Sequence, residues 1–270
     1  MKRTKKTAAL SHTPEKEEPS VSLQTETSQT PAYNGSATDT LQVLGRRRRA
    51  WVKATTRLTN QAKAILRNGD DSKKELPLKR LLEGASVQDV LLVQPLVDAL
   101  DLIKVHRVQC EGEIEKTALL LPIAPWVDQV RGFGIKSLGI LVGQAVSSQG
   151  CVFDADRPAK VWKRFGLAVF NGQRQRKVTG DPEEAIRQGY NPTRRSEVFV
   201  IGECLMKQNP EYKAVYDARK VASAIKHPDW TKGHCHMDAK RYMEKRFLRD
   251  LWREWHRVQP DLPTVPEFQG

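Results

Sequence analysis

The chain has 270 residues, with 45 Lys and Arg against 32 Asp and Glu, so its formal net charge at pH 7 is +13. This length is enough to bury a core in one or two domains. The hydrophobic content of 39% and the mean hydropathy of −0.56 predict that part of the chain does not fold. Because residues 131–257 contain 25 basic and 14 acidic residues, the sequence excludes a calcium-type acidic protein and indicates a polyanionic partner.

The sequence lacks the patterns that are typical of membrane, secreted and metal-binding proteins. No apolar run approaches the length of a bilayer span, and the first residues lack the apolar stretch of a signal peptide. The four cysteines form no CxxC pair and are expected to be reduced thiols. Since His234-Cys235-His236 has no second ligand pair at a usable spacing, we predict no metal ion and no cofactor. Because the sequence shows neither a membrane span nor a signal peptide, and its thiols are expected to be reduced, we predict a cytoplasmic location.

Residues 1–45 are rich in Ser, Thr, Gln, Pro and Glu and are predicted to be a disordered tail. A helical and coiled-coil segment is expected over 46–121. Its first helix has one apolar face from Trp51 to Ile65 and ends at Asn68-Gly69. A short helix is expected around 73–83, and Ser86 is a predicted N-cap.

The longest predicted helix, 95–121, begins at Pro95, which suits a first turn. Apolar residues recur along it at steps of three and four, from Leu96 through Cys110 and Ile114 to Leu121. Such a seam is typical of an antiparallel hairpin or a short coiled coil. The partner helix is expected either within the chain or in a second copy, so 95–121 is also a candidate homodimer interface.

A helix-hairpin-helix pattern follows Pro125, because a spaced apolar run leads into Gly132-Phe133-Gly134 and a second apolar helix. The two glycines permit a tight turn, and the N–H groups that open the second helix can bind a phosphate oxygen without reading bases. An alternative is a glycine-linked helical corner with no ligand. The predicted phosphate contacts of the hairpin are Arg131, Gly132, Phe133, Gly134, Ile135 and Lys136.

Three basic segments follow the hairpin. A short helix begins at Pro158 and ends at Gly166, an extended stretch covers 173–177, and a basic helix start lies near Asn191. They are either solvated faces or phosphate contacts, and their closeness to the hairpin favours contact. The predicted contact residues here are Lys160, Lys163, Arg164, Arg174, Arg176, Lys177, Arg194 and Arg195.

The C-terminal helix, expected over about 237–258, is the clearest amphipathic segment. Its predicted buried stripe consists of Met243, Phe247, Leu248, Leu251, Trp252 and Trp255. On a neighbouring face Arg241, Lys245 and Arg249 are predicted to contact nucleic acid, although a solvated charged face is the alternative. The predicted fold is therefore mainly α, with a helix-hairpin-helix domain over 122–258 and a flexible tail over 259–270.

The order of these motifs resembles one known domain. Gly132-Phe133-Gly134, then Ala159-Lys160-Val161-Trp162, Phe165-Gly166-Leu167-Ala168 and Asn191-Pro192-Thr193-Arg194-Arg195 are similar to the C-terminal domain of the insertion-sequence one-ten family of transposases. The resemblance covers roughly 120–257, and the helices before it resemble that family's connecting coiled coil. It implies a role in DNA transposition or recombination, DNA as partner, and structured RNA as a second possible partner.

Two departures separate the chain from that family. Family members begin with a ribonuclease-H-like domain that supplies four metal-binding carboxylates, and here the corresponding region is the short tail. The family's serine follows a Gly-Leu-x-Pro turn, whereas this chain has Val169 for the proline and no serine in 166–173. Ser196 does not match the motif. The resemblance therefore implies DNA binding without autonomous catalysis, and we predict no catalytic residue.

Three alternatives remain open. A split transposase would act with a partner that supplies the carboxylate domain. A DNA glycosylase would use Lys136 as nucleophile and Asp154 as its carboxylate, because these residues lie at the spacing that such hairpin enzymes use. A structural protein would dimerise through 95–121, with its basic surface serving solubility. If DNA is bound, the protein is expected at the bacterial nucleoid.

Overall fold

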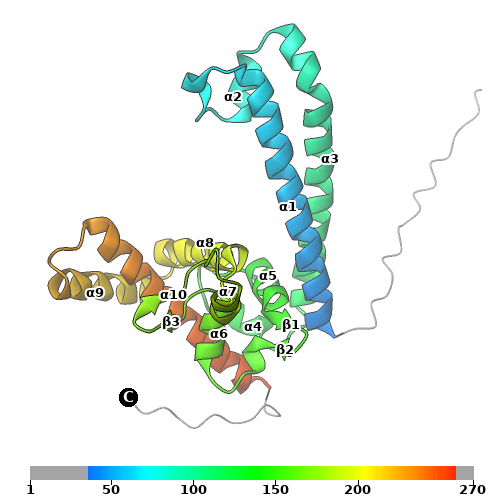
Figure 1. The fold of residues 1–270 in the computed structure, drawn as a ribbon. Helices are drawn as coiled ribbons and strands as arrows, with labels where there is room; N and C mark the ends of the chain where they lie inside the picture. Colours follow the sequence, from blue (N-terminus) through cyan, green and yellow to red (C-terminus); the bar gives the residue numbers. More distant parts are fainter. Residues whose placement is uncertain (1–35, 260–270) are drawn as a thin grey trace, which may run out of the picture. The chain divides into compact units, whose positions relative to one another are not determined.

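The computed structural model describes residues 36–259, and this part of the chain is mainly helical, which confirms the predicted fold class (Figure 1). Two small antiparallel sheets pair β1 with β2 and β3 with β4. No helix of the described range is both long and apolar enough to cross a membrane. The helices are α1 (Ala37–Arg67), α2 (Leu78–Glu83), α3 (Val87–Ala118), α4 (Ala124–Val127), α5 (Ile135–Ala145), α6 (Pro158–Arg164), α7 (Pro182–Gln188), α8 (Pro192–Gln208), α9 (Pro210–Lys226) and α10 (Lys232–Arg257). The strands are β1 (Val146–Ser147), β2 (Gly150–Cys151), β3 (Val169–Phe170) and β4 (Gln173–Arg174), and short 3₁₀ turns span Asp71–Lys73 and Val152–Asp154.

Helix α1 begins at Ala37, so the predicted disorder of 1–45 is wrong for its last nine residues. Ser36 caps the helix, since its hydroxyl accepts the N–H of Asp39 at 3.3 Å. Leu41 and Leu44 are buried in the main core, and this burial stabilises a segment whose polar composition alone did not predict it. Residues 1–35 and 260–270, which include most of both predicted tails, lie outside the described residues.

Helix α3 begins at Val87, eight residues before the predicted start at Pro95. The predicted cap is confirmed, because the Ser86 hydroxyl accepts the N–H of Asp89 at 3.2 Å. Pro95 therefore lies inside the helix and has no N–H to donate to the carbonyl of Leu91. The helix continues through this missing bond, and apolar clusters join it to α1 both near Val93 and near Ile114.

Helices α1 and α3 lie side by side as an antiparallel hairpin (Figure 1). Near its open end Cys110, Ile114 and Ala118 of α3 are buried, and the Cys110 thiol contacts the carbonyl of Leu44 at 3.5 Å. At the other end a second apolar cluster joins α1, α2 and α3 around Leu81 and Val93. The seam of 95–121 thus has its partner within the chain. Pairing of two copies through this segment stays a prediction.

The glycine-centred turn forms, but the helix before it is short. Helix α4 has only four residues and is followed by turns up to Gly134, the N-cap of α5. Gly132 has a φ of +87°, which confirms the need for glycine in this tight turn. Helix α5 is buried along most of its length, from Leu138 to Ala145. The second half of the predicted motif is therefore a core helix.

Helix α10 forms the centre of the domain, and Figure 1 shows it running alongside α9 and α6. The predicted apolar stripe is confirmed, since all six of its residues are buried. The indole N–H groups of Trp252 and Trp255 donate to the Ala155 carbonyl and the Asp154 carboxylate, both at 2.8 Å. Both tryptophans therefore serve the core, which leaves the polar edge of α10 for the surface.

Candidate nucleic-acid interface

The hairpin is fixed against the core through its central residues. Phe133 is buried and packs edge-on against Phe247, with 4.8 Å between ring centroids. A Cβ at Gly132 would lie 2.8 Å from the backbone oxygen of Cys204, so the backbone of the turn packs directly against the backbone of α8 and leaves no room for a side chain. Gly134 faces open space and caps α5 without a side-chain hydrogen bond. Gly134, which precedes the first N–H groups of α5, is consequently exposed, as is Arg131, whereas residues 135–137 are half-buried.

The charge of Lys136 is already compensated. Its ammonium lies 3.3 Å from Glu111 and 3.8 Å from Glu115, both on α3. Arg48 also pairs with Glu111, at 3.1 Å, and bridges to Glu197 at 2.9 Å. This network joins α1, α3, α5 and α8. Lys136 and the partly buried Ile135 therefore stabilise the fold more directly than they present a phosphate contact.

Four predicted basic residues line one cavity of about 650 Å³ beside β1, β2, α6 and the start of α8. They are Lys160, Lys163, Arg164 and Arg194. Lys160 pairs with Asp156 at 2.8 Å, and Arg164 donates to the carbonyls of Gln144 and Val146 at 3.0 and 2.6 Å.

Arg194 makes no ion pair with any carboxylate between residues 36 and 259. Burial, together with the positive charges of the neighbouring Arg164 and Arg49, lowers its pKa to about 10. Like charges are thus held close together at Arg194, while Asp154, the carboxylate that lines this cavity, accepts the indole N–H of Trp255. An anion bound there would relieve their repulsion.

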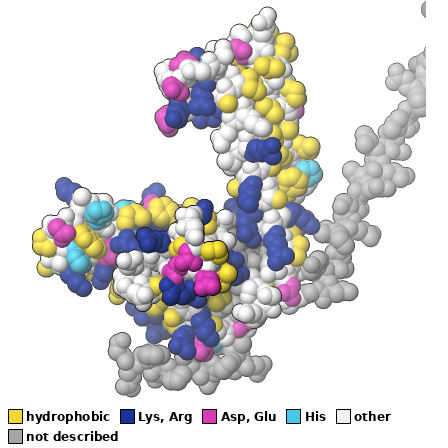
Figure 2. Space-filling view, in the orientation of Figure 1, with side chains coloured by type: hydrophobic (Ala, Val, Ile, Leu, Met, Phe, Trp, Pro, Cys, Tyr) yellow, Lys and Arg dark blue, Asp and Glu magenta, His cyan; other side chains and the backbone are white. Residues whose placement is uncertain are grey.

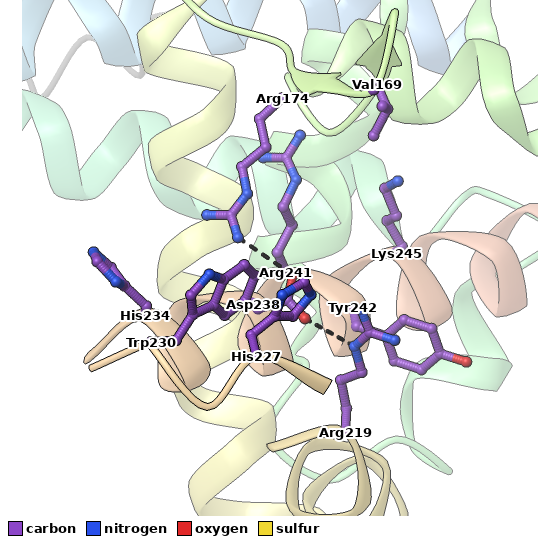
Figure 3. Close-up of a pocket in the computed structure, with 11 residues that line it drawn as sticks. Val169, Arg174, Arg219, His227, Trp230, His234, Asp238, Arg241, Tyr242 and Lys245 are labelled. Atoms are coloured by element: carbon purple, nitrogen blue, oxygen red, sulfur yellow. Dashed lines mark hydrogen bonds and ion pairs between the residues drawn. The ribbon is translucent and has the colours of Figure 1, made fainter. Parts of the chain in front are cut away.

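A second cavity, of about 600 Å³, lies between the β3–β4 turn, α9 and α10 (Figure 3). Arg174, Arg241 and Lys245, all predicted contacts, line it together with Arg219. Burial lowers the pKa of Arg241 to about 10, with Arg195 and Arg174 acting in the same direction. Burial also lowers the pKa of Lys245, and the adjacent Arg241 adds to this effect.

Asp238 is the acidic group of this second cavity. Its carboxylate accepts hydrogen bonds from Arg219 at 2.8 Å, Ser223 at 2.9 Å and Arg174 at 3.3 Å (Figure 3). Burial alone would raise its pKa, but the bonds from Ser223 and Arg219 outweigh burial and hold the pKa below its usual value. Asp238 is thus ionised at neutral pH and fixes two guanidinium groups at the cavity wall.

A third, smaller hollow of about 260 Å³ adjoins the second cavity. Arg174 lines it as well as the second cavity, and Arg176 lies beside it. Lys163 of the first cavity lies over the ring of Phe170, 5.8 Å from its centroid, at the edge of this hollow. We name eight basic side chains that line these three hollows the basic belt: Lys163, Arg164, Arg174, Arg176, Arg194, Arg219, Arg241 and Lys245. In Figure 2, Lys and Arg side chains recur across the face on which α6, α7 and β3 lie, interrupted by acidic side chains over α7.

Five buried or half-buried hydrogen bonds, made by the side chains of Gln175, Arg241 and Trp162, hold the belt in shape. The Gln175 side chain donates to the carbonyls of Lys163 and Gln188 and accepts the N–H of Ala168. Arg241 donates to the Ala168 carbonyl at 3.0 Å, and the Trp162 indole donates to the carbonyl of Lys245 at 3.1 Å. The β3–β4 segment, α6, α7 and α10 are therefore joined beneath the basic surface.

The remaining predicted contacts lie elsewhere. Arg195 forms an ion pair of 2.8 Å with Glu244, whose side chain is fully buried, so it belongs to the core. Arg249 lies 3.7 Å from Asp250 on α10. Lys177 is exposed after β4. The prediction that every basic residue of these segments faces a ligand therefore fails for Arg195, because a carboxylate from α10 binds it.

The buried carboxyl of Glu244 predicts a pH dependence of stability. Burial raises its pKa from 4.5 to about 7, although Arg195, Lys240 and Arg241 oppose this rise. The folded state then binds the proton more tightly than the unfolded chain, so its stability falls as pH rises from 4.5 towards 7. We expect the free energy of unfolding to drop by about 2 kcal/mol between pH 5 and pH 7 relative to Glu244→Gln. Urea titrations of both proteins across this range measure it, and parallel pH profiles would contradict it.

Several residues of the second cavity were missed by sequence reasoning. Arg219, His227, Trp230 and Tyr242 come from α9, the α9–α10 loop and α10, and they meet only in the folded chain. Aromatic residues interleaved with basic ones between 216 and 245 were an available signal. His234 also lines this cavity, whereas Cys235 is buried and His236 hydrogen-bonds with Tyr216. Within residues 36–259 no cluster of three or more metal-ligating side chains occurs.

The glycosylase hypothesis gains no geometric support. Lys136 is held by the carboxylates of α3, and Asp154 accepts the indole N–H of Trp255. No protein-family model matches the sequence, and the comparisons with curated proteins and with solved structures give no match. The resemblance to the transposase domain accordingly rests on the motifs alone.

Proposed function

We propose that the protein binds the phosphate backbone of DNA through the basic belt, with the hairpin as an additional contact. The observation that carries this proposal is the convergence of six separately predicted basic residues in two cavities. They are Lys163, Arg164, Arg174, Arg194, Arg241 and Lys245. Arg176 and Arg219 also line the hollows of the basic belt. The carboxylates that line these hollows, Asp154, Glu184 and Asp238, each already accept a hydrogen bond within the fold.

An extended polyanion fits this arrangement better than a compact anion. The belt runs over α6, the β3–β4 segment, α9 and α10, and its cations lie in separate hollows. A nucleic-acid strand carries charges at regular intervals and can occupy several such positions at once. Structured RNA is the second possible partner, since it presents the same phosphates.

The hairpin supplies the smaller part of the proposed contact. Arg131 and Gly134, the N-cap of α5, are exposed, whereas Lys136 is neutralised by carboxylates of α3. Gly134→Asp is the suitable probe, because a side chain there meets no atom within 4 Å. Gly132→Asp would disturb the fold, since Gly132 has a positive φ and presses on α8. A transposition-related role would follow from the resemblance. Strand cleavage is no part of the proposal, because the sequence lacks the serine that the resemblance requires.

The salt dependence of affinity tests the proposal. Fluorescence anisotropy with duplex DNA, a branched junction and a structured RNA, at 50 to 200 mM salt, should show affinity that falls steeply with salt. We expect Lys163→Gln/Arg194→Gln to bind about tenfold more weakly and to reduce the slope of log affinity against log salt by about two.

The control is Lys79→Gln/Arg80→Gln, which removes two exposed charges from α2. This variant should keep the affinity and the slope of the unchanged protein. Absence of binding to all three nucleic acids at 50 mM salt would overturn the proposed function. Equal losses in the belt variant and the α2 variant would place the contact outside the belt.

A further inference from the structure

The second cavity carries aromatic side chains beside its cations, which phosphate binding alone does not require. His227 and Trp230 stack with ring centroids 4.0 Å apart and 9° between their planes. His234 meets the Trp230 ring edge-on at 6.3 Å. All three line the cavity, and Figure 3 shows the rings of Trp230 and His227 lying together below Arg174 and Arg241.

The cations of this cavity stand on its other sides. Arg174 comes from β4, whereas Arg241 and Lys245 are one turn apart on α10 (Figure 3). Arg219 lies over the Tyr242 ring, 5.0 Å from its centroid. Asp238 orients Arg174 and Arg219, while Arg241 is anchored to the Ala168 carbonyl by one nitrogen. Guanidinium and ammonium groups therefore face a cavity that is also lined by the aromatic rings of His227 and Trp230.

We propose that this cavity binds one nucleotide with an accessible base. The phosphate lies against Arg241 and Lys245, and the base extends the His227–Trp230 stack. The cavity volume of about 600 Å³ suits a ligand of this size. The inference deepens the proposed function and rests on it, since it assigns the cavity to an unpaired nucleotide of the bound strand.

Base stacking explains why the nucleotide must be unpaired. In a duplex both faces of each base are covered by neighbouring bases, so only a single strand, a strand end or a bulge can offer a free face. Aromatic side chains stack on bases of any sequence, because every base has a π face. The cavity thus distinguishes strand state and not sequence.

An abasic oligonucleotide separates the base from the phosphates. The protein is titrated into a labelled twelve-residue thymidine oligonucleotide and into an abasic strand of the same length and charge. We expect the base-containing strand to bind about tenfold more tightly. Trp230→Leu should bring the two affinities together, and Trp230→Phe should retain most of the difference.

Trp51→Leu is the matched control, because Trp51 also stacks on a histidine, His106, but on the α1–α3 hairpin. It should leave the preference for bases unchanged. Thermal unfolding of each variant shows that the fold is retained. A nucleoside monophosphate that displaces the thymidine strand would identify a free nucleotide as a ligand, whereas displacement only by oligonucleotides would identify a strand. Both results support the site.

Equal affinity of the unchanged protein for the two strands would overturn the nucleotide site and leave phosphate binding intact. A preference for bases that persists in Trp230→Leu would also overturn it. Binding to neither strand, nor to duplex DNA or structured RNA, would overturn the proposed function together with this inference.

Discussion

Replacing Gly143 with alanine is expected to destabilise the protein by about 3 kcal/mol. A Cβ at this position would lie 2.3 Å from the backbone oxygen of Leu41 and 2.8 Å from its carbonyl carbon. Both atoms are backbone, so no rotamer change relieves the contact, and α1 must move away from α5. The midpoint of urea unfolding, followed by far-UV circular dichroism, measures the loss.

Gly45→Ala is the matched control for this prediction. Gly45 also lies in a helix, α1, but a Cβ there meets no atom within 4 Å. The substitution should stabilise the protein by about 0.5–1 kcal/mol, because alanine restricts the unfolded chain and favours helix. If both alanines shift the midpoint equally, the close approach of α1 and α5 at Gly143 is not present in solution.

The contact between α1 and α5 shows why the sequence predicts the presence of helices and turns better than it predicts their first and last residues. Local signals located the Ser86 cap, the tight turn at Gly132 and the buried stripe of α10, since each depends on neighbours in sequence. The start of α1 at Ala37 depends on the burial of Leu41 against α5, a hundred residues away in the chain. Composition within 1–45 could not reveal such a partner.

In the candidate site, too, some features could be predicted from the sequence and others depend on residues that are distant in the chain. Sequence reasoning found the basic residues but could not tell free charges from paired ones, because pairing is decided by distant carboxylates. Lys136 and Arg195 were predicted to bind phosphate, and Glu111 and Glu244 bind them instead. Arg219 was not predicted at all, since its place in the second cavity depends on Asp238 of another helix. Charge density along a chain therefore predicts a class of ligand more securely than it predicts contact residues.

Arg195→Met is expected to lower the free energy of unfolding at pH 8 by up to about 1.4 kcal/mol through the charge of Glu244, because beyond that cost the carboxyl takes up a proton. Glu244 has a fully buried side chain, and Arg195 lies 2.8 Å from its carboxylate. A Cβ at Gly202 would lie 2.9 Å from the Glu244 Cγ, so α8 packs tightly on this carboxylate. In the unchanged protein Arg195 lowers the pKa of this carboxyl, which is about 7, so the pKa rises further when the guanidinium is removed. At pH 8 the folded variant then either keeps an ion without its close partner or binds a proton that the unfolded chain does not bind.

The double variant Arg195→Met/Glu244→Gln distinguishes a lost charge pair from lost packing. It keeps the methionine but removes the buried charge, so most of the stability at pH 8 should return. At pH 5 the carboxyl of the single variant is protonated, and the two proteins should unfold at nearly the same urea concentration. If the single variant is equally unstable at pH 5 and pH 8, the arginine acts through its volume, and the loss does not come from an unpaired carboxylate.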